Sequence, residues 1–171
     1  MIECRSVKRL IVTADDFGLS TELNEAVRLG FSQGVLGSAS LMVAAPAAAE
    51  AVALAKSLPG LKVGLHLTFV DGRPILPAGL LPDLVGPDGR FRAGLFAPGA
   101  RMFFHKGAQR QVFAECEAQF AAFAATGLAL DHVNGHNHFH IHPTILDAVL
   151  TLSQRYKIPA VRVPDQPWSS L

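Results

Sequence analysis

The sequence is poor in cysteine, in charge of one sign and in long apolar runs. Only Cys4 and Cys116 are present among 171 residues, so a disulfide framework is excluded and a reducing cytoplasm is the expected location. Lysine and arginine number 15 against 14 aspartates and glutamates, with no run of five like charges. This balance disfavours nucleic acid and anionic membrane as partners. The sequence also lacks an apolar stretch long enough to span a bilayer and the basic-then-apolar order of a signal peptide.

What is present is an apolar chain of the size of one domain. Hydrophobic residues make up 50% of the sequence and charged residues 17%, which is typical of a globular protein with a large core. We therefore expect a single domain over residues 1–171. The apolar stripe of the helix predicted at 109–126 contains Val112, Phe113, Cys116, Phe120 and Phe123. We therefore expect these side chains in the core and the Cys116 thiol to be buried, not reactive.

Short β-branched runs alternate with helical periods along the chain. Strands are predicted at 9–14, 38–45, 61–69, 128–133 and 160–163, and helices at 20–34, 46–59, 109–126 and 143–157. Residues 71–105, rich in glycine and proline, predict an ordered excursion with turns. Such alternation predicts an α/β fold with a parallel sheet, open or closed into a barrel. In these folds the working groups lie at the carboxyl ends of the strands.

Asp15 and Asp16 lie side by side at the end of the first predicted strand. Adjacent residues of an extended segment point to opposite sides, but at a bend into a loop both can approach one centre. A metal ligand paired with a general base is one use of such a pair; alternatively, one aspartate caps the next helix and the other is solvated. His66 lies in an apolar strand and alone is more typical of a hydrogen-bonded core histidine, but it ends a strand of the same sheet.

Five of the seven histidines fall within residues 132–142. Four of them alternate with other residues: His136, His138, His140 and His142. This spacing places them on one face if the strand continues, whereas a helical backbone would bring His136 and His140 together. Either arrangement lets imidazoles converge on a cation such as zinc. The alternative is a surface histidine run that holds no metal.

An aspartate and two histidines leave coordination positions open, which is typical of a catalytic metal. We therefore expect one divalent ion, zinc or magnesium, which would polarise a carbonyl and lower the pKa of bound water to about 7. Asp15 would then take the proton from the attacking water. The other histidines would orient the ligands, contact the substrate or act as a general acid, and sequence spacing leaves these roles open.

Three segments resemble the YdjC-like family of carbohydrate deacetylases, which includes chito-oligosaccharide deacetylases. They are Thr-Ala-Asp-Asp-Phe-Gly at 13–18, Gly-Leu-His-Leu at 64–67, and the histidine-rich run that ends at His142-Pro143. The resemblance implies a (β/α) barrel variant, a distorted TIM-like fold. It also implies a metal-dependent hydrolase that removes an N-acetyl group from an amino sugar.

Carried onto this chain, the resemblance implies a defined set of site residues. The metal ligands would be Asp16, His66 and His136, with Asp15 as the catalytic base. Substrate contacts or residues that orient the site would be His138, His140 and Arg162. The segment 134–138 reads Asn-Gly-His-Asn-His where many members have Asp-Ser-His-His-His, so the contacts beside the ligand are expected to differ.

Finer expectations follow from the same resemblance. Segments 131–134 and 38–46 look closest to the hopanoid-biosynthesis-associated branch, which implies an N-acetylglucosaminyl hopanoid, a glycolipid, as substrate. Family members are longer, and five strands are too few for an eight-stranded barrel, so we expect a truncated barrel without its C-terminal strands and general acid. The exposed sheet edges of such a barrel, and the dimers known in the family, favour a homodimer.

Three other functions fit the same residues. A metal-dependent phosphoesterase or another amidohydrolase would use a similar set, often with a second ion about 3.5–4 Å from the first. Metal storage or sensing through the histidine run would not need His66. An inactive scaffold would keep the metal-binding motif without turnover.

Overall fold

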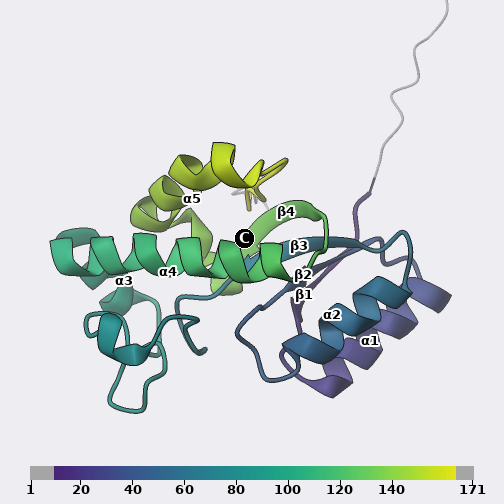
Figure 1. Ribbon diagram of the computed structural model, residues 1–171, viewed down its shortest axis with the longest axis horizontal. Helices are drawn as coiled ribbons and strands as arrows, with labels where there is room; N and C mark the ends of the chain where they lie inside the picture. The colour runs from purple at the N-terminus through teal and green to yellow at the C-terminus, as the bar shows by residue number, and fades with distance from the viewer. Residues whose placement is uncertain (1–9, 165–171) are drawn as a thin grey trace, which may run out of the picture.

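The structure, a computed structural model, describes residues 10–164 and contains one parallel sheet (Figure 1). Its strands are β1 (Thr13–Phe17), β2 (Ser38–Leu41), β3 (Lys62–Leu67) and β4 (Leu130–Gly135). They are ordered β1-β2-β3-β4, so each strand pairs with the next one in the chain. This sequential order is that of a (β/α) barrel, whereas a doubly wound sheet reverses its order. The α/β class and the parallel sheet are confirmed, and closure into a barrel stays a prediction.

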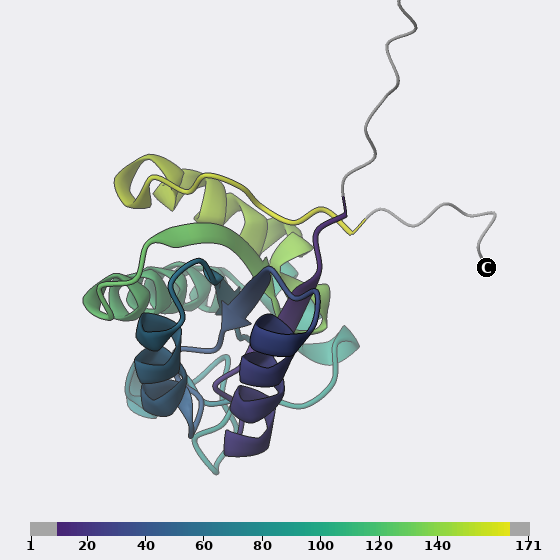
Figure 2. The same ribbon diagram turned by 90° about the vertical axis from the view of Figure 1, so that its right-hand side faces the viewer.

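Helices connect the strands and cover one side of the sheet. They are α1 (Thr21–Gln33), α2 (Ala48–Ser57), α3 (Phe96–Phe104), α4 (Lys106–Ala125) and α5 (Pro143–Tyr156), with short 3-10 helices η1 (Ala78–Leu80) and η2 (His136–Ile141). Figure 2 shows α1, α2, α4 and α5 following one another around the strands. The Ser20 side chain caps α1 by accepting a hydrogen bond from the N–H of Leu23, as predicted. No helix within residues 10–164 is long and apolar enough to cross a membrane.

The two faces of the sheet differ in chemistry. One face carries buried apolar side chains that pack with the helices in a single core: Ala39, Leu41, Val63, Leu65 and Val133. The alternate residues are polar or glycine, among them Ser38, Ser40, Gly64, His66, His132 and Asn134. Because side chains alternate along a strand, these polar groups share the face opposite the helices. In a (β/α) barrel this face lines the interior.

The first strand differs from its prediction. The apolar run at 9–14 indicated a strand that ends before the aspartates, but pairing with β2 begins only at Thr13, and Leu10 and Ile11 are exposed. The register shifts between Ala14 and Phe17, and Asp16 lies in the left-handed region with φ 58°. Such a bulge redirects a side chain. Both aspartates are therefore inside β1.

Residues 71–105 form the expected ordered excursion, and two buried side chains of α4 hold its first part in place. Glu115 accepts hydrogen bonds from the N–H groups of Ile75 and Leu76, at 2.8 and 3.0 Å. Gln119 accepts from the N–H of Thr68 at 3.0 Å and donates to its carbonyl oxygen at 2.8 Å. Burial raises the pKa of Glu115 although these bonds oppose the shift. The helix thus fixes the chain directly after β3.

The apolar stripe of α4 is narrower than predicted. Cys116, Phe120 and Phe123 are buried, as expected, and burial raises the pKa of the Cys116 thiol. Phe113 is 37% exposed, so its assignment to the core was wrong. The stripe follows residues three and four apart, from Val112 to Cys116, which leaves Phe113 at its margin.

The histidine run adopts neither expected arrangement. After Gly135 the chain enters η2, in which Asn137 and His138 have φ values of 53° and 56°. These left-handed residues interrupt both a strand and an α-helix, so His136 and His140 do not form an i, i+4 pair. The fifth predicted strand, 160–163, is reduced to a single bridge between Val161 and Val133.

Candidate metal centre

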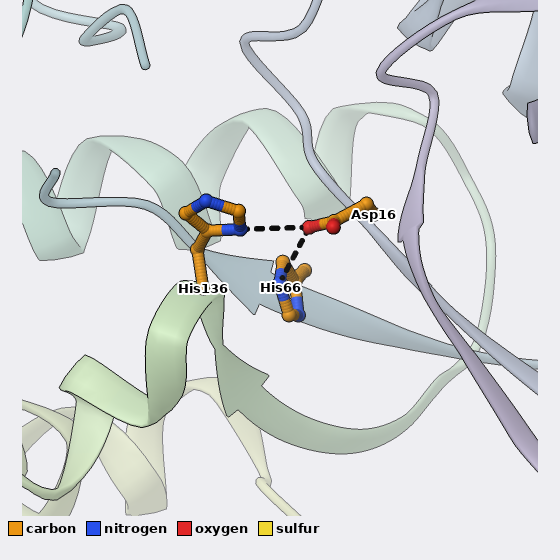
Figure 3. Close-up of side chains that lie close together, drawn as sticks. All are labelled: Asp16, His66 and His136. Atoms are coloured by element: carbon orange, nitrogen blue, oxygen red, sulfur yellow. Dashed lines mark hydrogen bonds and ion pairs between the residues drawn. The ribbon is translucent and has the colours of Figure 1, made fainter. Parts of the chain in front are cut away.

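Three side chains from different parts of the chain meet at the carboxyl edge of the sheet (Figure 3). Asp16 comes from the bulge of β1, His66 from β3, and His136 directly follows β4. The Oδ1 atom of Asp16 lies 2.8 Å from Nδ1 of His136 and 3.1 Å from Nε2 of His66. The structure thus brings together the three residues that the resemblance implied as ligands.

The three side chains form a site that is closed at its base and open on one side. His66 is 2% exposed, whereas the side chains of His136 and Asp16 are 20% and 31% exposed. The rings of His66 and His136 stand edge to face, at 79° to each other. Hydrogen bonding from His66 lowers the pKa of Asp16 to about 2 against the opposing effect of burial, and His136 adds to the lowering. Asp16 is therefore an anion at neutral pH.

The donor set fits a divalent cation. One ligand atom from each residue lies within 4.8 Å of the other two, and no second group of this kind occurs in the part of the chain that the structure describes. A carboxylate oxygen and two imidazole nitrogens are ligands that zinc accepts, whereas magnesium prefers oxygen alone. Asp16 and His136 stay partly exposed, and three protein ligands leave a coordination position open, which is typical of a catalytic and not of a structural arrangement.

Asp15 has different partners from Asp16, and both are polar side chains. Its Oδ2 atom accepts a hydrogen bond of 2.6 Å from Arg162, and its Oδ1 atom accepts one of 3.0 Å from Nδ2 of Asn134. Burial raises the pKa of Asp15, but Arg162, the charge of nearby His66 and Asn134 together hold it below its ordinary value. Asp15 is therefore ionised and held by partners on both oxygens.

The other histidines of the run have separate surroundings. His140 is 1% exposed, and its Nε2 atom donates to the carbonyl oxygen of Arg162 at 2.8 Å. Burial lowers the pKa of His140, so its ring is neutral at neutral pH. His142 caps α5 and contacts the carbonyl oxygen of Gly99, while His138 is exposed. His140 therefore holds the segment that carries Arg162.

Asn134 and Ser40 had no predicted role, and His132 had no specific one. The structure places them in a chain of hydrogen bonds that starts at His66 and runs through Asn134 and Ser40 to His132. Asn134 is the register partner of His66 on β4, and its Oδ1 atom lies 2.7 Å from Nδ1 of His66. A signal was available in the sequence. Polar residues recur with period two at Ser38 and Ser40 in one predicted strand, and at His132 in another and Asn134 directly after it, which indicates a second, polar face of the sheet.

Comparison with known proteins gives a consistent assignment. The family model described as YdjC-like protein matches residues 9–171. Proteins named carbohydrate deacetylase are 39% identical in Brevibacillus brevis (91% of this chain, 59% of the relative) and 38% identical in Vibrio vulnificus (88% and 57%).

A solved structure shares the fold. It belongs to an Enterococcus faecalis protein named for the cleavage of cellobiose-phosphate, with a TM-score of 0.80 and 29% identity, covering 96% of this chain and 62% of that one. The chain thus spans about three fifths of the length of these relatives. Because the family model covers nearly the whole sequence, the chain belongs to the YdjC-like protein family.

Proposed function

We propose that this chain carries the metal centre of an enzyme that removes the N-acetyl group from an amino sugar. The observation that carries the proposal is the convergence of Asp16, His66 and His136 at the carboxyl edge of the sheet. Relatives named carbohydrate deacetylase support the reaction and the substrate class. Metal dependence is supported by the donor set and by the open side of the site.

Each ligand would have a distinct part in holding the ion. His66 would offer Nε2 from the buried base of the site, and His136 would offer Nδ1 from its more open side. Asp16, an anion at neutral pH, would offset part of the charge of the cation. Bound there, zinc or magnesium supplies Lewis acidity, which polarises the acetyl carbonyl and acidifies water.

Asp15 is the proposed general base. Its lowered pKa keeps it ionised, and bonds from Arg162 and Asn134 restrict its orientation. It would accept a proton from the attacking water as the C–O bond forms at the acetyl carbon. That proton is then available to the departing amine as the C–N bond breaks, which yields acetate and a free amino sugar.

The proposed substrate is an N-acetylglucosamine unit, either in a chito-oligosaccharide or on a glycolipid such as a hopanoid. Both present the same acetamide to the open side of the site. Arg162 and exposed His138 are the proposed residues near the substrate, whereas buried His140 would act only by holding the backbone of Arg162.

Acetate release with and without added Zn²⁺ or Mg²⁺ tests the function, with N,N′-diacetylchitobiose and an N-acetylglucosaminyl lipid as the two substrates. We expect metal-dependent release by the wild type and a loss of about 10²–10⁴-fold in Asp15→Asn with metal binding retained. Asp147→Asn, an exposed change of the same charge on α5, is the matched control. Absence of acetate from both substrates with either metal would contradict the proposal.

A further inference from the structure

We propose that Asn134 is the positioning residue of the metal centre: its side-chain amide fixes which nitrogen of His66 faces the metal and holds Asp15 in place. Asn134 is fully buried, and its three hydrogen bonds use the whole amide. The inference rests on the proposed function only in taking His66 as a metal ligand.

The orientation of the amide follows from its neighbours. The guanidinium of Arg162 can only donate, and it bonds Oδ2 of Asp15 at 2.6 Å, so this carboxylate accepts and the group of Asn134 that lies 3.0 Å from its Oδ1 atom must be the NH₂. The carbonyl oxygen of Asn134 then faces Nδ1 of His66 at 2.7 Å and must accept a proton from it. Asn134 thus holds a proton on Nδ1 of His66. The Nε2 atom, which lies 3.1 Å from Asp16 and bonds it when protonated, is the one left to bind a metal ion.

A chain of hydrogen bonds behind Asn134 gives the same orientation independently. The second N–H of Asn134 donates to Oγ of Ser40 at 2.9 Å. The Ser40 hydroxyl then donates to Nε2 of His132, also at 2.9 Å, and Nδ1 of His132 donates to Asp131 at 3.0 Å. The Asp131 carboxylate accepts, so with one proton on His132 every hydrogen bond of the chain has a single direction. A flipped amide would break this order at both ends.

Strand register and a glycine make room for this chain. His66 and Asn134 are register partners on β3 and β4, and Ser40 is opposite Gly64 on β2 and β3. A Cβ atom at Gly64 would lie 2.5 Å from the His132 ring, so a side chain there would displace His132 from Ser40. The glycine of the Gly-Leu-His segment therefore serves the second layer of contacts around the metal ligand.

Zinc affinity, measured by competition with a chromophoric chelator, tests the role of the carbonyl oxygen. Asn134→Leu removes the acceptor for His66 and should weaken binding about 10–100-fold. Asn134→Asp keeps an acceptor for His66 but loses both N–H donors. Its zinc affinity should stay near that of the control Asn137→Asp, which adds the same charge on the exposed side of η2. Equal loss in Asn134→Leu and Asn134→Asp, or no loss in Asn134→Leu, would overturn the proposal.

A second measurement needs neither metal nor activity. In ¹⁵N spectra of metal-free Asp16→Asn, which has no carboxylate beside Nε2 of His66, the singly protonated ring should carry its proton on Nδ1. In the same background Asn134→Leu should lose this preference, and Ser40→Ala should weaken it, while Ser153→Ala on the exposed side of α5 should not. A proton on Nε2 in Asp16→Asn would refute the role of Asn134. Absence of zinc binding by the wild type, with the expected tautomer in Asp16→Asn, would refute the metal centre instead.

Discussion

The Nδ1 atom of His66 lies 2.7 Å from the Oδ1 atom of Asn134, its register partner on the neighbouring strand. The site is thus built across the sheet as well as at its edge. A shift of β4 by one residue would replace Asn134 by Val133 or Gly135 on this face, since side chains alternate along a strand. The geometry of the ligand is therefore as sensitive to strand pairing as to the identity of the histidine.

Metal content separates the proposed centre from binding by the histidine run. His66→Ala should lose the single divalent ion per chain, because it removes the buried ligand, while His138→Ala should keep it, because His138 is exposed in η2. Elemental analysis of the purified proteins after dialysis measures both. The reverse pattern, with His66→Ala retaining the ion, would favour storage or sensing through the run.

The stability of the metal-free protein should depend on Asp16 at acidic pH. Its folded pKa of about 2 is below the ordinary value of 3.8, so ionised Asp16 stabilises the fold. This contribution is complete above about pH 4 and is lost as the pH falls toward 2. Because the side chain is partly exposed, we expect about 1 kcal/mol.

Urea unfolding in EDTA at pH 5 and pH 2.5 measures the effect for the wild type and Asp16→Asn. The difference in free energy of unfolding between the two proteins should shrink at the lower pH. Asp147→Asn on the exposed side of α5 should follow the wild type at both values. A difference that is independent of pH would show that Asp16 is not preferentially ionised in the folded state.

The pH dependence of turnover should report the pair formed by Asp15 and Arg162. Arg162 lowers the pKa of Asp15 through a hydrogen bond and its charge, so Arg162→Met should raise it. The acid limb of the profile of log kcat/KM against pH should then move to higher pH, because Asp15 takes up its proton at a higher pH. Arg155→Met, which removes an exposed ion pair with Glu117, is the control, and an unmoved limb in Arg162→Met would argue against Asp15 as the base.

The sequence predicted which segments meet at the site but not where their strands end or the finer geometry. Asp16, His66 and His136 could be placed together because parallel strands present their carboxyl ends at one edge. The left-handed turn at Asp16 and the path of η2 could not, because both depend on pairing with distant segments. The polar face that carries Asn134 could be inferred from the period-two pattern, but its partners could not, since they lie 68 and 119 residues away.

The buried contacts of α4 should matter for stability more than its exposed ones. Glu115→Ala leaves the N–H groups of Ile75 and Leu76 without their acceptor, which should cost about 2–4 kcal/mol. Glu117→Ala on the same helix removes an exposed ion pair with Arg155 and should cost less than about 1 kcal/mol. Denaturant unfolding compares them, and equal costs would show that Glu115 does not hold the loop.

Gly18 and Gly94 allow the cost of a positive φ to be distinguished from the cost of a steric clash, because only Gly18 has close neighbours. Gly18 and Gly94 both have positive φ, at 95° and 79°. Alanine is strained in this conformation, so at either position it should lower the free energy of unfolding by about 1 kcal/mol. A Cβ atom at Gly18 would also lie 3.1 Å from the Cα atom of Ala48, whereas nothing lies within 4 Å at Gly94. This atom of Ala48 belongs to the backbone of α2, which cannot move aside as the end of a flexible side chain can.

We therefore expect Gly18→Ala to be less stable than Gly94→Ala by about 1–3 kcal/mol, the usual cost of overpacking. For a chain of this length that difference lowers Tm by roughly 2–4 °C per kcal/mol. Because Gly18 follows the strand that carries Asp16, Gly18→Ala should also weaken zinc binding, and Gly94→Ala should not. Equal Tm values would mean that α2 moves away from β1 without cost, and the position of Asp16 would then not depend on that contact.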